Sequence, residues 1–304
     1  MAPVFALIVV GHVIRRLLVD APEFWSGVDR LAYWVLLPSL LFNKIATMSV
    51  SADFIGPFAV VVLAGFLAAF VFSYVASRML GFAGPVASSV VQGASRHNTF
   101  VALAVTERMF GAAGQSAAYL ASSILIPITN VAVVIAIVVL HQSATGAASV
   151  TRAILRDIIR NPLIIAVTAG ALFNAAGLGR TPVLHDATDL LGRAALPLVL
   201  LAIGASIRFE GLRATLAPMG IATVGKMLVF PVAMIAVAQW QSLALIPACV
   251  AMIYGTAPTA TSAYALARQM GGDAPLAATI VTVQTLLSVL TIPLGILAAR
   301  MLFS

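Results

Sequence analysis

Long apolar stretches follow one another along almost the whole of this chain, and this feature restricts its fold more than any other. A membrane-spanning helix needs about 20 predominantly apolar residues. Ten such stretches can be placed, at about 2–19, 31–49, 56–79, 84–108, 117–140, 161–178, 187–207, 214–238, 243–268 and 275–302. Hydrophobic residues make up 62% of the chain and charged residues 9%, against roughly 45–50% and 25% in a soluble domain. The sequence therefore predicts an all-α integral membrane protein with ten transmembrane helices and no soluble catalytic domain.

The charged residues favour one orientation in the membrane. The chain has 17 Lys and Arg against 10 Asp and Glu, but the basic residues form no run interleaved with aromatic residues, so we expect no nucleic acid partner. If the N-terminus lies outside, the inner loops hold ten of the basic residues and the outer loops five. Because basic residues concentrate in cytoplasmic loops, the count predicts that both termini face the outside.

The first span does not have the pattern of a cleaved signal peptide, and the single cysteine predicts neither a disulfide nor a metal site. Arg15 and Arg16 follow the first span and no basic residue precedes it, which is the reverse of a secretory signal peptide, so we expect this span to remain in the mature protein. Cys249 has no partner for a disulfide or a cysteine-based metal site and is assigned to packing. We expect neither a metal nor a cofactor.

The two halves of the chain share a weak internal similarity. A shift of 159 positions places Pro3 on Pro162, Gly11 on Gly170 and Pro38 on Pro197. With five spans in each half, the halves have opposite orientations, which is the inverted-repeat plan of many secondary transporters. The sequence thus predicts a single membrane domain built from a first repeat at 1–145 and a second at 146–304. The alternative is a coincidence among helices rich in Leu and Ala.

The fourth and ninth spans each carry an interruption at membrane depth. It reads GASRHNT at 93–99 and YGTAPTATS at 254–262, where Pro258 removes a backbone donor. Non-helical backbone survives at this depth only where it is buried in protein or lines a wet cavity. Two broken helices that cross would present half-helix N-termini, which attract anions.

Arg96 is the charged residue that most needs an explanation. An arginine at the centre of a bilayer costs roughly 3 kcal/mol on insertion scales. Arg96 lies about a dozen residues from either end of its predicted span, which is some 18 Å of helix and too far for the side chain to reach the surface. No Asp or Glu occupies the middle of a span, so the counter-ion is predicted to be a substrate carboxylate. The alternative is a structural arginine that bonds carbonyl groups of the interrupted helix.

Other polar residues in the spans complete the predicted substrate site. Lys226 is either a second cation of the site or a lysine paired with a loop carboxylate, and His97 either carries a coupling proton or acts as a hydrogen-bonding spacer. The remaining predicted substrate-binding residues are Asn98, Thr99, Gln92, Pro258, Thr259 and Asn43.

Several segments resemble the auxin efflux carrier family, in the right order along the chain. They are QGASRHNTFVALAV at 92–105, RNPLIIAVTAGAL at 160–172, ALPLVLLAIGASI at 195–207, TAPTATSAYALARQMGGD at 256–273 and VTVQTLLSVLTIPLGIL at 281–297. The resemblance implies two inverted five-helix repeats, a scaffold domain, a transport domain with crossed fourth and ninth helices, and elevator-type alternating access. It also implies that Asn98 and Pro258 lie where these two helices cross.

Two departures from the plant members of that family narrow the substrate. His97 stands where they usually have Pro, and only about 20 residues separate the halves, where they have a long cytoplasmic loop. The chain is therefore similar to short bacterial carriers of malonate and other small carboxylates. The resemblance implies a small organic anion as substrate and the bacterial cytoplasmic membrane as location, with Arg96 as a charge suited to the anion.

Three functions compete at this point. The first is a secondary transporter of mono- or dicarboxylates, malonate-like or auxin-like. The second is a sodium-coupled symporter of the bile-acid type, which would use amides such as Gln92, Asn98 and Asn130. The third is a membrane-embedded enzyme, but the chain has no HExxH, no GxSxG and no mid-span pair of acids. The direction of transport, a proton or sodium as coupling ion, and a homodimer are left open.

The predicted orientation is testable with impermeant thiol reagents. In a Cys249→Ala background, Ser143→Cys should react only from the inside of the membrane and Ser304→Cys only from the outside, because the basic residues place the 141–160 loop in the cytoplasm. Labelling of Ser143→Cys from the outside of intact cells would contradict the orientation.

Overall fold

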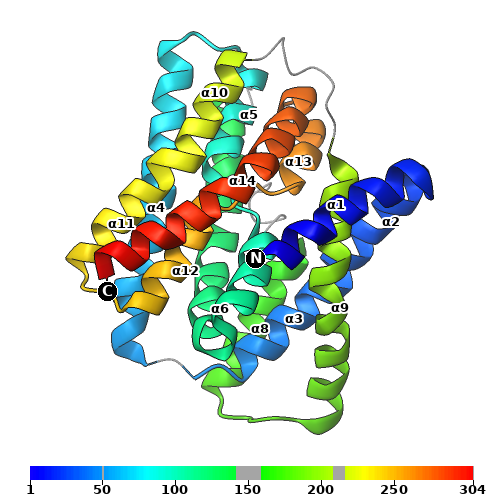
Figure 1. The fold of residues 1–304 in the computed structure, drawn as a ribbon, viewed down its shortest axis with the longest axis vertical. Coiled ribbons are helices and arrows are strands. Elements are labelled where there is room, and N and C mark those ends of the chain that lie inside the picture. Colours follow the sequence, from blue (N-terminus) through cyan, green and yellow to red (C-terminus); the bar gives the residue numbers. More distant parts are fainter. Residues whose placement is uncertain (50, 142–158, 208–215, 304) are drawn as a thin grey trace.

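The computed structural model describes residues 1–49, 51–141, 159–207 and 216–303, and all regular elements in these ranges are helices (Figure 1). They are α1 (Ala2–Leu17), α2 (Pro22–Leu31), η1 (Ala32–Leu36), α3 (Leu37–Ala46), α4 (Ala52–Met79), α5 (Gly84–Ser95), α6 (Thr99–Leu140), α8 (Pro162–Ala175), α9 (Pro182–Ser206), α10 (Leu216–Val224), η2 (Gly225–Val229), α11 (Phe230–Trp240), α12 (Leu245–Thr256), α13 (Ser262–Met270) and α14 (Ala274–Phe303). Within the described ranges, five helical stretches are long and apolar enough to cross a membrane, and two shorter apolar helices accompany them. The all-α membrane class is confirmed, whereas ten spans remain a prediction.

Some sequence-based predictions lie outside the described residues. They are the boundary between the predicted repeats at 145/146, most of the 141–160 loop, and the labelling positions Ser143 and Ser304.

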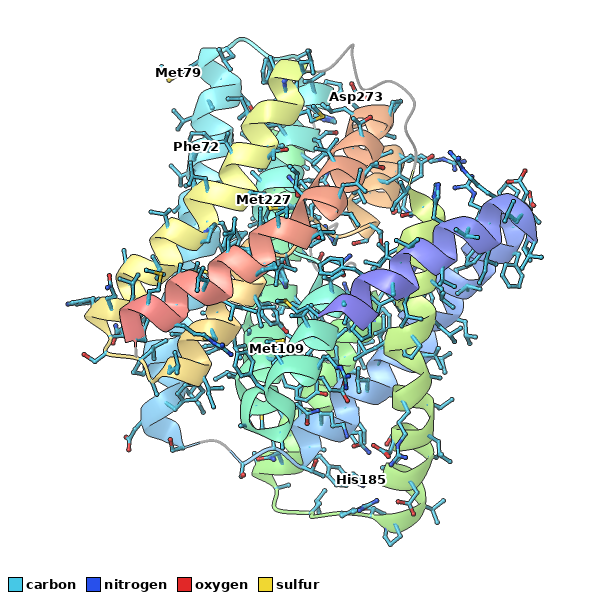
Figure 2. The ribbon with its side chains drawn as sticks, in the orientation of Figure 1. Phe72, Met79, Met109, His185, Met227 and Asp273 are labelled. Carbon is cyan, nitrogen blue, oxygen red and sulfur yellow. The ribbon has the colours of Figure 1, made fainter. Side chains whose placement is uncertain are left out.

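Three labelled residues mark the two ends of the molecule. Met79 and Asp273 lie at one end, and His185 lies at the opposite end (Figure 2).

The second helical stretch begins earlier than its predicted start near residue 31. It starts at Pro22 and runs through α2, η1 and α3 to Ala46. Pro22 occupies the first turn, where the missing N–H costs no hydrogen bond, and Glu23 lies at the positive end of the helix. The indole of Trp25 donates to the carbonyl of Val19 at 2.8 Å and holds the preceding turn. The first two turns of this helix therefore contain charged residues that the hydropathy pattern left outside the predicted span.

The helices pack in two groups. α1 lies along α9, and α3 lies along α8 and α9, whereas α4, α5, α10 to α12 and α14 pack mainly against one another (Figure 1). α6 belongs to the second group through α12, α4 and α5, and it also contacts α8 and α9. The two groups thus meet along α6.

α6 is two helices joined by a sharp reversal. Gly111 has non-helical backbone angles, φ 51° and ψ −137°, which glycine adopts without steric cost. Tyr254 donates to the carbonyl of Ala118, and its ring lies 5.6 Å from that of His97, so the second segment returns beside the start of the first. The predicted fourth and fifth spans are therefore antiparallel neighbours with almost no loop between them.

Glycines allow the closest helix contacts in the first group. A β-carbon on Gly11 of α1 would overlap with the carbonyl of Leu201 in α9, and one on Gly204 would overlap with the carbonyl of Ile8. A β-carbon on Gly170 of α8 would lie 3.1 Å from the carbonyl oxygen of Phe42 in α3. Small residues of this kind let helix backbones approach in a membrane, where packing rather than water drives association.

Gly204 should be among the positions least tolerant of a side chain. Gly204→Ala should lower the free energy of unfolding by about 1–3 kcal/mol, because the added carbon forces α1 and α9 apart. The measurement is the unfolding midpoint in detergent. Gly56→Ala in α4 is the matched control, since no atom lies within 4 Å of the added carbon. Equal midpoints for the two variants would contradict this account of the α1–α9 contact.

Candidate functional site

The first predicted interruption is present, and Asn98 defines its far side. α5 ends at Ser95, Arg96 is extended with φ −74° and ψ 154°, and α6 begins at Thr99. The side-chain oxygen of Asn98 accepts hydrogen bonds from the backbone N–H groups of Phe100 and Val101, each at 3.1 Å. Asparagine is a favoured N-cap because it satisfies backbone donors that the first turn leaves open. The break is therefore set by a capping residue rather than by a proline.

The second interruption is present as well, and here proline sets it. α12 ends at Thr256, Ala257 is extended with φ −63° and ψ 149°, and α13 begins at Ser262. A residue before proline is disfavoured in the helical region, which places the end of α12 directly ahead of Pro258. The backbone N–H of Asn98 donates to the carbonyl of Pro258 at 2.7 Å. The two breaks are thus joined backbone to backbone.

Gln284 of α14 supports both breaks, and the sequence analysis did not single it out. Its side-chain oxygen accepts from the backbone N–H of Thr259 at 2.9 Å, and its nitrogen donates to the carbonyls of Gly93 at 3.0 Å and Ala222 at 3.3 Å. The side chain is fully buried. The signal that could have found it is a lone amide within the apolar 275–302 stretch.

Arg96 lies at the start of α13. Its Nη2 donates to Oγ of Ser262, the first residue of that helix, at 3.0 Å, and its side chain is largely buried. A helix N-terminus carries partial positive charge, so the guanidinium and the helix end repel each other. An anion placed between them would be attracted by both.

Lys226 lies at a helix C-terminus, that of α12, whereas Arg96 lies at the N-terminus of α13. Its Nζ donates to the carbonyls of Tyr254 and Gly255 in the last turn of α12, at 3.0 and 3.1 Å, and it sits 3.7 Å from the centre of the Phe230 ring. A cation is favourable at a helix C-terminus. Among the described residues, Lys226 binds carbonyl groups and an aromatic face, and not the loop carboxylate that one of the two sequence-based alternatives expected.

Three polar side chains of the crossing have buried atoms with no hydrogen-bond partner among the described residues. The atoms are Nε2 and Oε1 of Gln92, Nδ2 of Asn98 and Nδ1 of His97. Gln92 lies in the last turn of α5, and Oγ1 of Thr259 donates to its backbone carbonyl at 3.3 Å. Buried polar groups in native proteins nearly always have a partner, so groups of this kind indicate a place for a ligand or for water.

A family model described as a membrane transport protein matches residues 1–296. The chain belongs to this membrane transport family. No curated protein matches the chain. The family match confirms the resemblance to auxin efflux carriers that the segments around Asn98 and Pro258 indicated. Members of the family are transporters rather than enzymes, so the chain is a membrane transporter.

Of the nine site residues predicted for this transporter, most lie at or beside the crossing. Gln92, Arg96, His97, Asn98, Thr99, Pro258 and Thr259 belong to the breaks or the adjoining turns, and Lys226 reaches the last turn of α12. Asn43 does not. Its amide nitrogen donates to the carbonyl of His185 at 2.8 Å and to Oγ1 of Thr188 at 3.0 Å, so it links α3 to α9.

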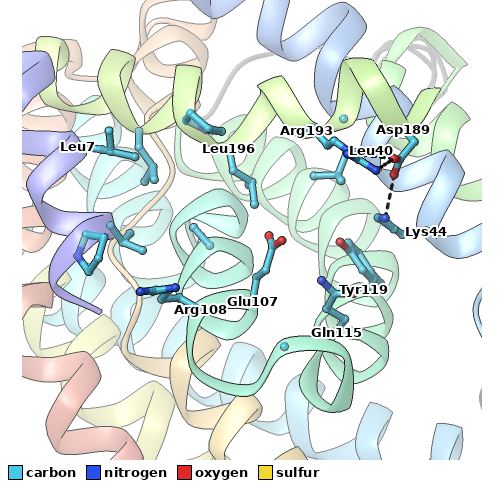
Figure 3. Close-up of a pocket in the computed structure, with 17 residues that line it drawn as sticks. Leu7, Leu40, Lys44, Glu107, Arg108, Gln115, Tyr119, Asp189, Arg193 and Leu196 are labelled. Atoms are coloured by element: carbon cyan, nitrogen blue, oxygen red, sulfur yellow. Dashed lines mark hydrogen bonds and ion pairs between the residues drawn. The ribbon is translucent and has the colours of Figure 1, made fainter. Parts of the chain in front are cut away.

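A cavity of about 760 Å³ lies between α1, α3 and α9 on one side and α6 on the other (Figure 3). Its charged lining includes Lys44, Asp189 and Arg193, with Asp189 bridging Lys44 at 3.1 Å and Arg193 at 2.7 Å. Glu107 and Arg108 face it from α6 (Figure 3). None of the nine predicted residues lines it. The transporter therefore has a cavity between its two helix groups, lined by charged as well as apolar side chains and separate from the crossing.

The capping role of Asn98 requires the side-chain oxygen but not the amide nitrogen. Asn98→Ala should lower the free energy of unfolding by about 1 kcal/mol, because two backbone N–H groups lose their acceptor. Asn98→Asp should retain most of the stability, since a carboxylate caps a helix equally well. Unfolding midpoints in detergent without added carboxylate measure both. An Asp variant as unstable as the Ala variant would show that the cap is not what holds the break.

Proposed function

We propose that this transporter moves small organic anions, mono- or dicarboxylates of the malonate or auxin type, across the bacterial cytoplasmic membrane. The observation that carries the proposal is the position of Arg96, a buried guanidinium at the N-terminus of α13. Beside it, Gln92 and Asn98 present amide atoms with no partner among the described residues. A planar guanidinium suits a carboxylate because it offers two parallel N–H donors.

The contacts of the first helix group support an inverted-repeat architecture. Gly11 packs on Leu201, and Gly170 packs on Phe42. Adding 159 to Gly11 gives Gly170, and subtracting 159 from Leu201 gives Phe42, so the shift found in the sequence relates the two contacts. In the proposed architecture α1 corresponds to α8, and α3 corresponds to α9. This correspondence and the two breaks support the proposal of ten spans in two repeats of five.

The division into two helix groups supports alternating access by an elevator motion. In the proposed motion, α1, α2, η1, α3, α8 and α9 form the scaffold, and the remaining helices carry the crossing past it. The cavity of about 760 Å³ lies between these groups, in the half that the predicted orientation places outside. It would give a carboxylate a route toward the crossing that passes the charged side chains of Lys44, Arg108 and Arg193.

Arg96 should control affinity for carboxylates. Charged hydrogen bonds contribute roughly 1.5–3 kcal/mol each, and 1.4 kcal/mol corresponds to a tenfold change in affinity. Arg96→Gln should therefore weaken binding of malonate or indole-3-acetate by about two to four orders of magnitude, and Arg96→Lys should recover part of it. Binding to purified protein is measured by the rise in unfolding temperature with ligand concentration.

Arg268→Gln is the matched control, because it removes an exposed arginine from the same helix, α13, and should leave affinity unchanged. Unchanged affinity in Arg96→Gln would make Arg96 a structural residue. Repeating the titrations with and without sodium separates the competing sodium-coupled symporter, for which carboxylate affinity would rise with sodium concentration.

A further inference from the structure

His97 is a titratable group of the crossing to which the proposed function assigns no role. It lies in the break between α5 and α6 and is almost fully buried. Its Nε2 is 3.0 Å from Oγ1 of Thr99, and its ring lies 5.6 Å from that of Tyr254. Its Nδ1 is buried without a partner among the described residues. In the tautomer in which Nε2 donates to Thr99, a second proton can be accepted at Nδ1 without breaking a hydrogen bond.

The surroundings of His97 are rich in positive charge. Arg96 is adjacent in the chain and Lys226 interacts with His97 electrostatically, while the ring of Tyr254, a further titratable group, lies beside that of His97. The elements of the crossing are α5, residues 96–98, η2, α12, residues 257–261 and α13. None of them contains Asp or Glu. α6 has none before Glu107, which faces the cavity, and α14 has none. A proton on His97 would thus add a third positive charge to a site whose own elements supply no negative one.

An organic anion in the site would supply that negative charge. Because the anion and the proton attract each other across a buried site, each raises the affinity for the other by the same factor. In the protonated form both ring nitrogens carry hydrogen, so Nε2 donates to Thr99 and Nδ1 can donate to the anion.

We infer that His97 takes up a proton from solution when a carboxylate binds at the crossing, so that the transporter carries the two together. The inference rests on the proposed function and adds a coupling ion to it. Carboxylate affinity should then fall, by up to about tenfold per pH unit, as the pH rises from the pKa of His97 in the free protein to its pKa in the carboxylate-bound protein.

Calorimetric titration in buffers of different ionisation enthalpy tests the inference. With malonate as probe at pH 7, the wild-type protein should take up a measurable fraction of a proton more than His97→Gln does, because the contribution of the ligand is common to both. His185→Gln, which alters a buried histidine of α9, should match the wild type. Binding with equal proton uptake in wild type and His97→Gln would overturn the inference and leave the proposed function standing. The absence of binding to the wild type would overturn the proposed function itself.

A second readout does not require His97 to be replaced. The chain has four histidines, so a variant with His12, His141 and His185 changed to Gln retains His97 alone. Malonate should shift the histidine ring NMR signals of this variant toward the protonated form at pH 7. Signals that move with pH but not with malonate would overturn the inference.

Discussion

A broken helix at membrane depth must find partners for its open backbone groups, and the rest of this structure depends on how that is done. In hydrocarbon an unsatisfied N–H or C=O costs several kcal/mol. Here each break supplies what the other lacks, because the N–H of Asn98 donates to the carbonyl of Pro258 and Gln284 bridges Thr259 to Gly93. The side chain of Asn98 caps one helix, and Lys226 binds the last carbonyls of another. Hydrogen bonds from both backbone and side chains thus hold the two breaks together.

The two buried cations of the crossing have different roles because they face opposite helix ends. Lys226 sits at the carbonyl end of α12, where the helix itself stabilises a positive charge. Arg96 sits at the amide end of α13, where the helix opposes one. Side-chain type alone does not distinguish them. The helix ends do, and they make Arg96 the cation that gains most from a bound anion.

Sequence reasoning located the membrane class and the two breaks, because apolar length and a proline or capping residue are local signals. Pro258 and Asn98 act on neighbouring backbone, so their effects are readable from the chain. The partners of Lys226 and the position of Asn43 were not readable, since they depend on how α12 and α9 pack against η2 and α3. Gln284 was missed for the same reason, although its isolation in an apolar span was a usable signal. The start of the second helix was placed late, because hydropathy does not register a proline-initiated polar turn.

The most direct test of the central claim, that the crossing of the broken helices binds a carboxylate, is an anomalous difference map of crystals soaked with a bromine-labelled carboxylate. The account predicts a bromine peak that places the carboxylate within hydrogen-bonding distance of Arg96 and Ser262, next to the amides of Gln92 and Asn98. A peak in the cavity lined by Lys44, Asp189 and Glu107, with none at the crossing, would contradict it.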